Sequence, residues 1–163
     1  MTYQSRLRRL EPNETWPTLH GAAWERYWDG MELATCGQVR HAGAIHLLGY
    51  VAEILLKVAF YRIVGYSPGQ AADTRTIKIH SDWHGKNMHS LTDLAQVLVA
   101  ERATRQIPLD PVFGGLLTSH VLTISNHRKE DLRYRYTLAT QAEMAEVYQS
   151  VDWLLTNATL LWS

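Results

Sequence analysis

The longest apolar pattern in this chain runs from residue 41 to residue 62 and repeats every three or four positions. This period is that of an α-helix, and so few polar positions interrupt it that a central, buried helix is expected, ending near Gly65. Glu53 and Lys57 lie inside it, four residues apart and in the order that favours an ion pair on one helix. If Glu53 is buried, it needs a partner, because an unpaired buried carboxylate is costly.

Four further helical segments surround the central one. The first is expected from about Leu19 to Cys36, with an apolar stripe of Trp24, Tyr27, Trp28 and Met31. Gly37 is the expected break between it and the central helix. Residues 65 to 89 show no sustained period, and so long a loop inside a compact domain is typically functional or mobile.

Three capping patterns predict where the remaining helices begin. Ser90 can cap the third helix, and Asp110 followed by Pro111 can cap the fourth. Thr140 and Glu143 form a capping box for the last helix, which is expected to run to the end of the sequence. With five helices, no convincing strand pattern and no repeat, the expected fold class is all-α, an antiparallel up-and-down bundle of about five helices.

Composition narrows the class of protein. The 163 residues suit one domain, which we expect at 19–163 after an N-terminal extension at 1–18. Sixteen basic and sixteen acidic residues cancel, so any nucleic-acid surface must be local. A single cysteine, Cys36, fits a reducing compartment, and His46, Glu53 and Lys57 interrupt the best candidate for a membrane span. These features predict a cytoplasmic protein without a membrane partner.

The order of several short motifs carries a family resemblance. They are A-E-x-x-x-K at Ala52, Glu53 and Lys57, H-S-L-x-x-L at His89, Ser90, Leu91 and Leu94, and an R-Y element at Arg133, Tyr134, Arg135 and Tyr136 before the final helix. In this order the chain, from about residue 20 to residue 162, resembles the HEPN domain, a helical nucleotide-binding or ribonuclease-related bundle. The resemblance implies a homodimer in a prokaryotic defence, toxin–antitoxin or nucleotidyltransferase-linked system, with a nucleotidyltransferase or an antitoxin as a possible protein partner.

The chain departs from the ribonuclease members of that family. Those members carry an arginine followed, after four to six residues, by a histidine near the start of the last major helix. Here His127 precedes Arg133, and no histidine follows His127. The matching spacing occurs at Arg40–His46 and Arg75–His80, which lie in the wrong elements. We therefore expect a non-catalytic binding module. The alternative is a divergent, metal-independent endoribonuclease that uses His127 and Arg133.

The segment from residue 126 to residue 136 is the main candidate for ligand binding. Guanidinium groups suit phosphates, and tyrosine rings can stack on bases, so a nucleotide or RNA is the expected ligand. The alternative is a purely structural role, in which an arginine of this segment forms an ion pair with Glu53 of the central helix. A third interpretation is a scaffold whose tryptophan-rich faces dock a protein. The candidate ligand-binding residues are Arg128, Lys129, Arg133, Tyr134 and Arg135.

The histidines and tryptophans are expected to have structural roles. His80 and His84 could share a helical face, but Gly85 favours a loop and no third ligand completes a zinc site, so neither a metal nor a cofactor is expected. His89 is expected to bond the backbone at a helix start. His41, His46 and His120 are expected to be satisfied interior residues, and Trp24, Trp28, Trp153 and Trp162 are expected in the core or a dimer interface.

Overall fold

The structure, a computed structural model, describes residues 14–35, 40–72, 77, 86–87, 89–128 and 139–163. These residues form helices and one isolated bridge, and the all-α prediction is confirmed. The last expected helix is divided in two. The helices of the described part are α2 (Trp16–Thr35), α3 (His41–Ile63), α5 (Leu91–Thr104), α6 (Pro111–His127), α7 (Gln141–Thr156) and α8 (Ala158–Trp162).

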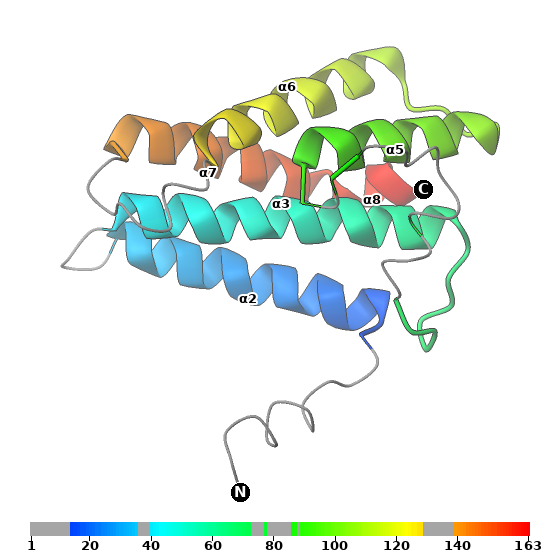
Figure 1. The fold of residues 1–163 in the computed structure, drawn as a ribbon, viewed down its shortest axis with the longest axis horizontal. Coiled ribbons are helices and arrows are strands. Elements are labelled where there is room, and N and C mark those ends of the chain that lie inside the picture. The colour runs from blue at the N-terminus through cyan, green and yellow to red at the C-terminus, as the bar shows by residue number, and fades with distance from the viewer. Residues whose placement is uncertain (1–13, 36–39, 73–76, 78–85, 88, 129–138) are drawn as a thin grey trace, which may run out of the picture.

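Helix α3 is the centre of the bundle. In Figure 1 it runs between α2 on one side and α5, α7 and α8 on the other, and α6 lies outermost. Fifteen of its 23 residues are buried, among them Leu48, Leu55 and Phe60. By length and composition α3 is the one described helix that could cross a membrane, but the bundle buries 67% of its most apolar window. Burial of this kind is what the core helix of a bundle requires.

Helix α2 packs along α3 through small residues. A Cβ atom at Gly30 would lie 3.2 Å from Cγ of Leu48, so the glycine permits a close approach of the two helices. On the same helix Tyr27 is buried, whereas Trp24 and Trp28 are exposed. The prediction of core packing is therefore wrong for those two tryptophans. Their place in a dimer interface stays a prediction.

The predicted helix ends are largely confirmed. The side chain of Ser90 accepts a hydrogen bond from the backbone of Asp93, and Asp110 accepts bonds from the first turn of α6. Thr140 and Glu143 form the expected capping box. Gly65 adopts a φ of 91°, in the left-handed region that closes many helices.

Two helix boundaries differ from the prediction. Helix α2 begins at Trp16, ahead of Leu19. The last helix breaks at Asn157, where the side-chain Nδ2 donates a 2.8 Å hydrogen bond to the carbonyl of Trp153. An asparagine side chain competes in this way with the backbone bonds that would continue a helix.

Candidate functional site

Polar side chains follow one face of α3. His46, Tyr50, Glu53 and Lys57 are separated by four, three and four residues, which places them along a single stripe of the helix. The rings of His46 and Tyr50 meet edge to face, with centroids 4.8 Å apart. Polar side chains are rare on this otherwise apolar helix, so this face is a candidate functional site.

Glu53 is the centre of an ion-pair cluster built from three parts of the chain. Its side chain is only 5% exposed. Lys57 Nζ lies 2.7 Å from Oε1, and His89 Nδ1 lies 3.0 Å from the same oxygen. Arg128 Nη2 donates a 2.8 Å bond to Oε2. The name Glu53 cluster refers below to Glu53, Lys57, His89 and Arg128.

The cluster keeps the Glu53 carboxylate ionised. Burial acts to raise the pKa of Glu53, but the hydrogen bonds and charges of Lys57 and Arg128 outweigh burial and hold the pKa below its usual range. Glu53 was expected to need a partner if it is buried, and it is buried with two cationic partners. The alternative of an Arg–Glu pair with Glu53 is therefore present, formed by Arg128.

The side chain of Arg128 packs against three residues of α3, namely Gly49, Tyr50 and Glu53. Its guanidinium carbon lies 4.6 Å from the ring centroid of Tyr50, in a cation–π contact. A Cβ atom at Gly49 would collide with Cδ of Arg128 and would lie 2.8 Å from Nε, so only glycine leaves room for the side chain. Arg128 is the residue after the end of α6. Glu53, Tyr50 and Gly49 together fix the point at which the chain leaves that helix.

His89 is the open side of the cluster. Its side chain is 72% exposed, although its Nδ1 contacts the buried Glu53. The His89 ring bonds the Glu53 carboxylate and not a backbone group, so the prediction of a backbone bond is wrong for this side chain. The backbone N–H of His89 donates to Asn87 Oδ1. A carboxylate on Nδ1 favours the tautomer that carries the proton there and presents Nε2 as an acceptor.

The other candidate residues from the sequence fall into two groups. Lys129, Arg133, Tyr134 and Arg135 lie outside the described residues, so their role as ligand-binding residues stays a prediction. His127 is described, and its Nε2 lies 2.9 Å from Glu146 while its Nδ1 lies 3.9 Å from Glu143. These contacts make His127 a link between the end of α6 and the start of α7.

The three helical histidines that were expected in the interior, His41, His46 and His120, are half-buried. His120 stacks on Trp153 with centroids 4.5 Å apart, and its Nδ1 lies 3.2 Å from Ser150 Oγ. Burial lowers the pKa of His120, which favours the neutral ring. No metal-binding group of three or more suitable side chains occurs among the described residues, and both His80 and His84 lie outside them.

Tryptophans at the two ends of the chain hold an arginine. The guanidinium carbon of Arg62 lies 4.7 Å from the ring centroid of Trp16 and 4.6 Å from that of Trp162. Trp153 and Trp162 are half-buried against the core, as expected. The arrangement joins α2, α3 and α8, and stabilisation of the bundle is a sufficient account of it.

Sequence reasoning missed the contact between His89 and Glu53. The two residues are 36 positions apart, so no helical spacing could pair them. The available signal was indirect, because both residues stand in the motifs that carry the family resemblance. No family model, curated protein or solved structure matches this chain.

Proposed function

We propose that this chain is a HEPN-like binding module for a nucleotide or RNA. The observation that carries the proposal is the anchoring of Arg128 to the buried Glu53. Arg128 is the first residue of the basic segment 128–135, in which Arg128, Lys129, Arg133 and Arg135 outnumber Glu130 and Asp131. Its bond to Glu53 fixes where that segment begins, and the exposed ring of His89 contacts the same carboxylate group. A binding segment whose first residue is anchored to a rigid helix starts from a defined position, which favours recognition of a phosphate group by the residues that follow.

The charge of the Glu53 cluster is favourable for an anion. One carboxylate faces Lys57 and Arg128, so the cluster has a net charge of +1 with neutral His89 and +2 when His89 is protonated. Because Arg128 is largely used by Glu53, we assign the direct phosphate contacts to Lys129, Arg133 and Arg135, which follow it in the sequence. Tyr134 supplies a ring for stacking on a base.

The binding test compares Arg133→Ala with a matched loss of charge. Fluorescence anisotropy of a labelled single-stranded RNA would be measured with wild type, Arg133→Ala and the control Arg26→Ala, which removes an exposed arginine paired with Asp29 on α2. We expect Arg133→Ala to weaken binding roughly tenfold and to reduce the salt dependence by about one counterion. Circular dichroism would verify that each variant is folded.

Three results would contradict the proposal. Wild type that binds no RNA or nucleotide would remove the function itself. Equal affinity of Arg133→Ala and Arg26→Ala would remove Arg133 from the site. Unfolding of Arg133→Ala would make that residue a structural one.

A divergent metal-independent endoribonuclease is the second candidate, and the geometry of His89 favours it. An exposed imidazole oriented by a buried carboxylate is suited to general acid–base chemistry. His127, the residue expected from the sequence, has carboxylates at both ring nitrogens instead. If the chain cleaves RNA, we expect His89→Ala to abolish cleavage and His127→Ala to reduce it less, as judged on denaturing gels of the same RNA. The reverse order would restore His127 as the catalytic candidate.

The cellular setting stays a prediction. A cytoplasmic location, a defence or toxin–antitoxin system, and a nucleotidyltransferase or antitoxin partner all follow from the resemblance and composition alone. None of them is needed for the binding test.

A further inference from the structure

Two tryptophans of α2 are exposed at the edge of the bundle. Trp24 is 41% exposed and Trp28 is 63% exposed. Among the described helices α2 packs chiefly on α3, so its other side has no helix against it (Figure 1). Indole rings carry a large apolar area that folding normally buries, so a pair of them on an uncovered side of a helix indicates a contact surface.

Tyr27 holds both indole rings in place. Its ring is buried and meets the rings of Trp24 and Trp28 edge to face, with centroids 5.9 and 5.3 Å apart. Its hydroxyl donates a 3.1 Å hydrogen bond to Asp152 of α7, and its ring stacks on Tyr148 of the same helix with centroids 6.1 Å apart. The two tryptophans are therefore attached to the frame of the bundle before any partner binds, which lowers the entropic cost of binding.

The charged side chains beside the tryptophans are acidic. Glu25 and Glu32 lie three residues before and four residues after Trp28, so both are its neighbours on the helix surface. Both are exposed, and neither forms an ion pair with a described residue. The only lysine or arginine in α2 and α7 is Arg26, which pairs with Asp29 at 3.0 Å. Unpaired carboxylates next to an exposed indole ring attract a cation.

The name acidic tryptophan face refers below to Trp24, Glu25, Trp28, Glu32 and Asp152, which are all exposed. Indole rings attract arginine by cation–π contact and stacking, and carboxylates accept paired hydrogen bonds from a guanidinium group. The phosphates of a nucleic acid would be repelled here. Glu25 and Glu32 are seven residues apart, roughly 10 Å along the helix, so one small cation is a poor match for both. A peptide segment with several arginines fits the whole face.

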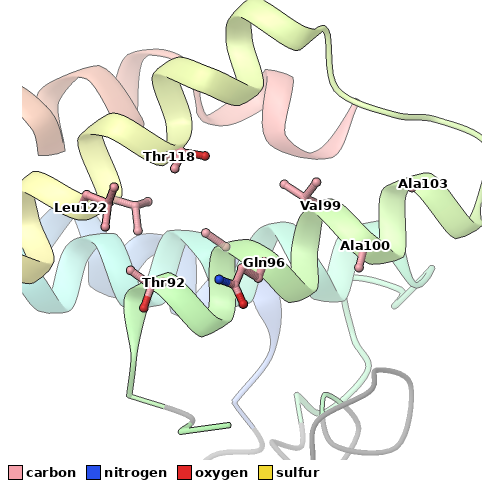
Figure 2. A pocket seen from close by; sticks show the side chains of 9 residues that line it. Thr92, Gln96, Val99, Ala100, Ala103, Thr118 and Leu122 are labelled. Atoms are coloured by element: carbon pink, nitrogen blue, oxygen red, sulfur yellow. The ribbon is translucent and has the colours of Figure 1, made fainter.

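The groove between α5 and α6 provides a comparison. Its volume is about 480 Å³, and Figure 2 shows Thr92, Gln96 and Val99 of α5 and Leu122 of α6 around it. Leu122 is 45% exposed, close to the exposure of Trp24, but no charged side chain lines the groove. The groove therefore offers nothing that favours a cation, and Leu122 supplies a control for the loss of exposed apolar area.

We propose that the acidic tryptophan face binds an arginine-rich segment of a partner protein. Arginine side chains of that segment stack on the two indole rings, and their guanidinium groups pair with the three carboxylates. The face lies on α2 and α7, whereas the Glu53 cluster joins α3 to the start of α5 and the end of α6. The proposal therefore does not depend on the proposed RNA site, and it gives the scaffold interpretation a surface and a partner chemistry.

The test is the binding of a fluorescein-labelled peptide in which pairs of arginines alternate with glycines. Fluorescence anisotropy would be measured with the full chain in the absence of RNA, and a peptide with glutamate in place of each arginine tests the sign of the charge. Trp28→Leu keeps an apolar side chain but loses the aromatic ring, and Glu32→Gln removes one carboxylate. The controls are Leu122→Ala at the groove and Arg133→Ala at the proposed RNA site. Circular dichroism would verify that each variant is folded.

We expect wild type to bind the arginine peptide and not the glutamate peptide, with an affinity that falls as salt is added. Trp28→Leu should raise the dissociation constant about tenfold, which corresponds to about 1.4 kcal/mol. Glu32→Gln should raise it about threefold, as expected for one exposed ion pair. Leu122→Ala and Arg133→Ala should bind the peptide as wild type does.

Several results would overturn the proposal. One is a folded wild type that binds neither peptide or binds both equally. Another is a Trp28→Leu variant that binds like wild type, or a control variant that loses as much affinity as Trp28→Leu, because the contact would then lie elsewhere. Self-association of wild type that Trp28→Leu abolishes in sedimentation equilibrium would make a second copy of this chain the occupant in place of a partner protein.

Discussion

At the middle of α3, the carboxylate of Glu53 binds side chains from its own helix, from the start of α5 and from the end of α6. Burial alone would make this carboxylate unfavourable, and Lys57 and Arg128 reverse that effect. The pair with Lys57 is local. The contacts with His89 and Arg128 connect segments that are distant in the sequence, so Glu53 holds the tertiary arrangement of the site.

Replacement of Glu53 tests this role. Glu53→Gln leaves Lys57 and Arg128 without their buried counter-charge, and we expect the free energy of unfolding to fall by about 3–5 kcal/mol. The control is Glu32→Gln on the exposed side of α2, for which a change within about 0.5 kcal/mol is expected. Urea unfolding at neutral pH measures both. A loss no larger than that of Glu32→Gln would contradict the account of Glu53.

The same pair of variants tests the pH dependence of stability. The folded-state pKa of Glu53 lies below the usual glutamate value of 4.5, so the unfolded chain takes up the proton more readily. The stabilisation is present above about pH 4.5 and is lost as the pH falls through the folded-state pKa. We expect the melting temperature of wild type to fall more steeply below that pH than the melting temperature of Glu53→Gln. If the melting temperatures of the two proteins fell equally steeply below that pH, the expectation would be contradicted.

At the scale of single residues, the sequence predicted that Glu53 needs a partner, but it did not predict all three partners of its carboxylate. The spacing of Glu53 and Lys57 predicted an ion pair on one helix. An arginine from segment 126–136 was expected either to bind a ligand or to pair with Glu53. The exposed His89 ring could not be assigned to Glu53, because the contact depends on how α5 packs on α3. The seat of Arg128 on Gly49 and Tyr50 has no local signature either.

The helices themselves were the most predictable part of the molecule. Caps at Ser90, Asp110 and Thr140 are local hydrogen bonds between a side chain and the next turn, so sequence spacing is sufficient to locate them. The orientation of Trp24 and Trp28 was not predictable in the same way. Both lie on the apolar stripe of α2 in the sequence, yet they are exposed while Tyr27 of the same stripe is buried. Which part of such a stripe is covered depends on how the helices pack, and that is not written in the local pattern.

The cap of α6 provides a test at the scale of one element. Asp110 accepts hydrogen bonds from the backbone N–H groups of Val112 and Phe113, at 3.0 and 3.1 Å. We expect Asp110→Ala to lower the free energy of unfolding by about 0.5–2 kcal/mol. Asp29→Ala, which removes an exposed ion pair within α2, should cost less than about 0.5 kcal/mol. Equal costs in chemical denaturation would show that the cap contributes little.

For the whole molecule, the bundle separates two surfaces by their chemistry. On the polar face of α3 the charges of the Glu53 cluster are largely buried, and His89 is its one well-exposed side chain, beside the start of the basic segment. On the outer side of α5 and α6, the exposed residues from Gln96 to Thr104 and from Val112 to Leu122 carry no charge. Composition could not reveal this separation, because the formal net charge of the chain is zero and the contrast exists only after folding.

The most direct test of the central claim is to observe the histidine rings while RNA is added. Nitrogen NMR of histidine-labelled protein would follow His89 together with His20, which meets Trp162 edge to face, and His120, which stacks on Trp153. If the Glu53 cluster adjoins the binding site, the His89 resonances should shift progressively with single-stranded RNA while those of His20 and His120 remain fixed. Excess RNA that leaves His89 unchanged, or that moves only His20 or His120, would contradict the claim.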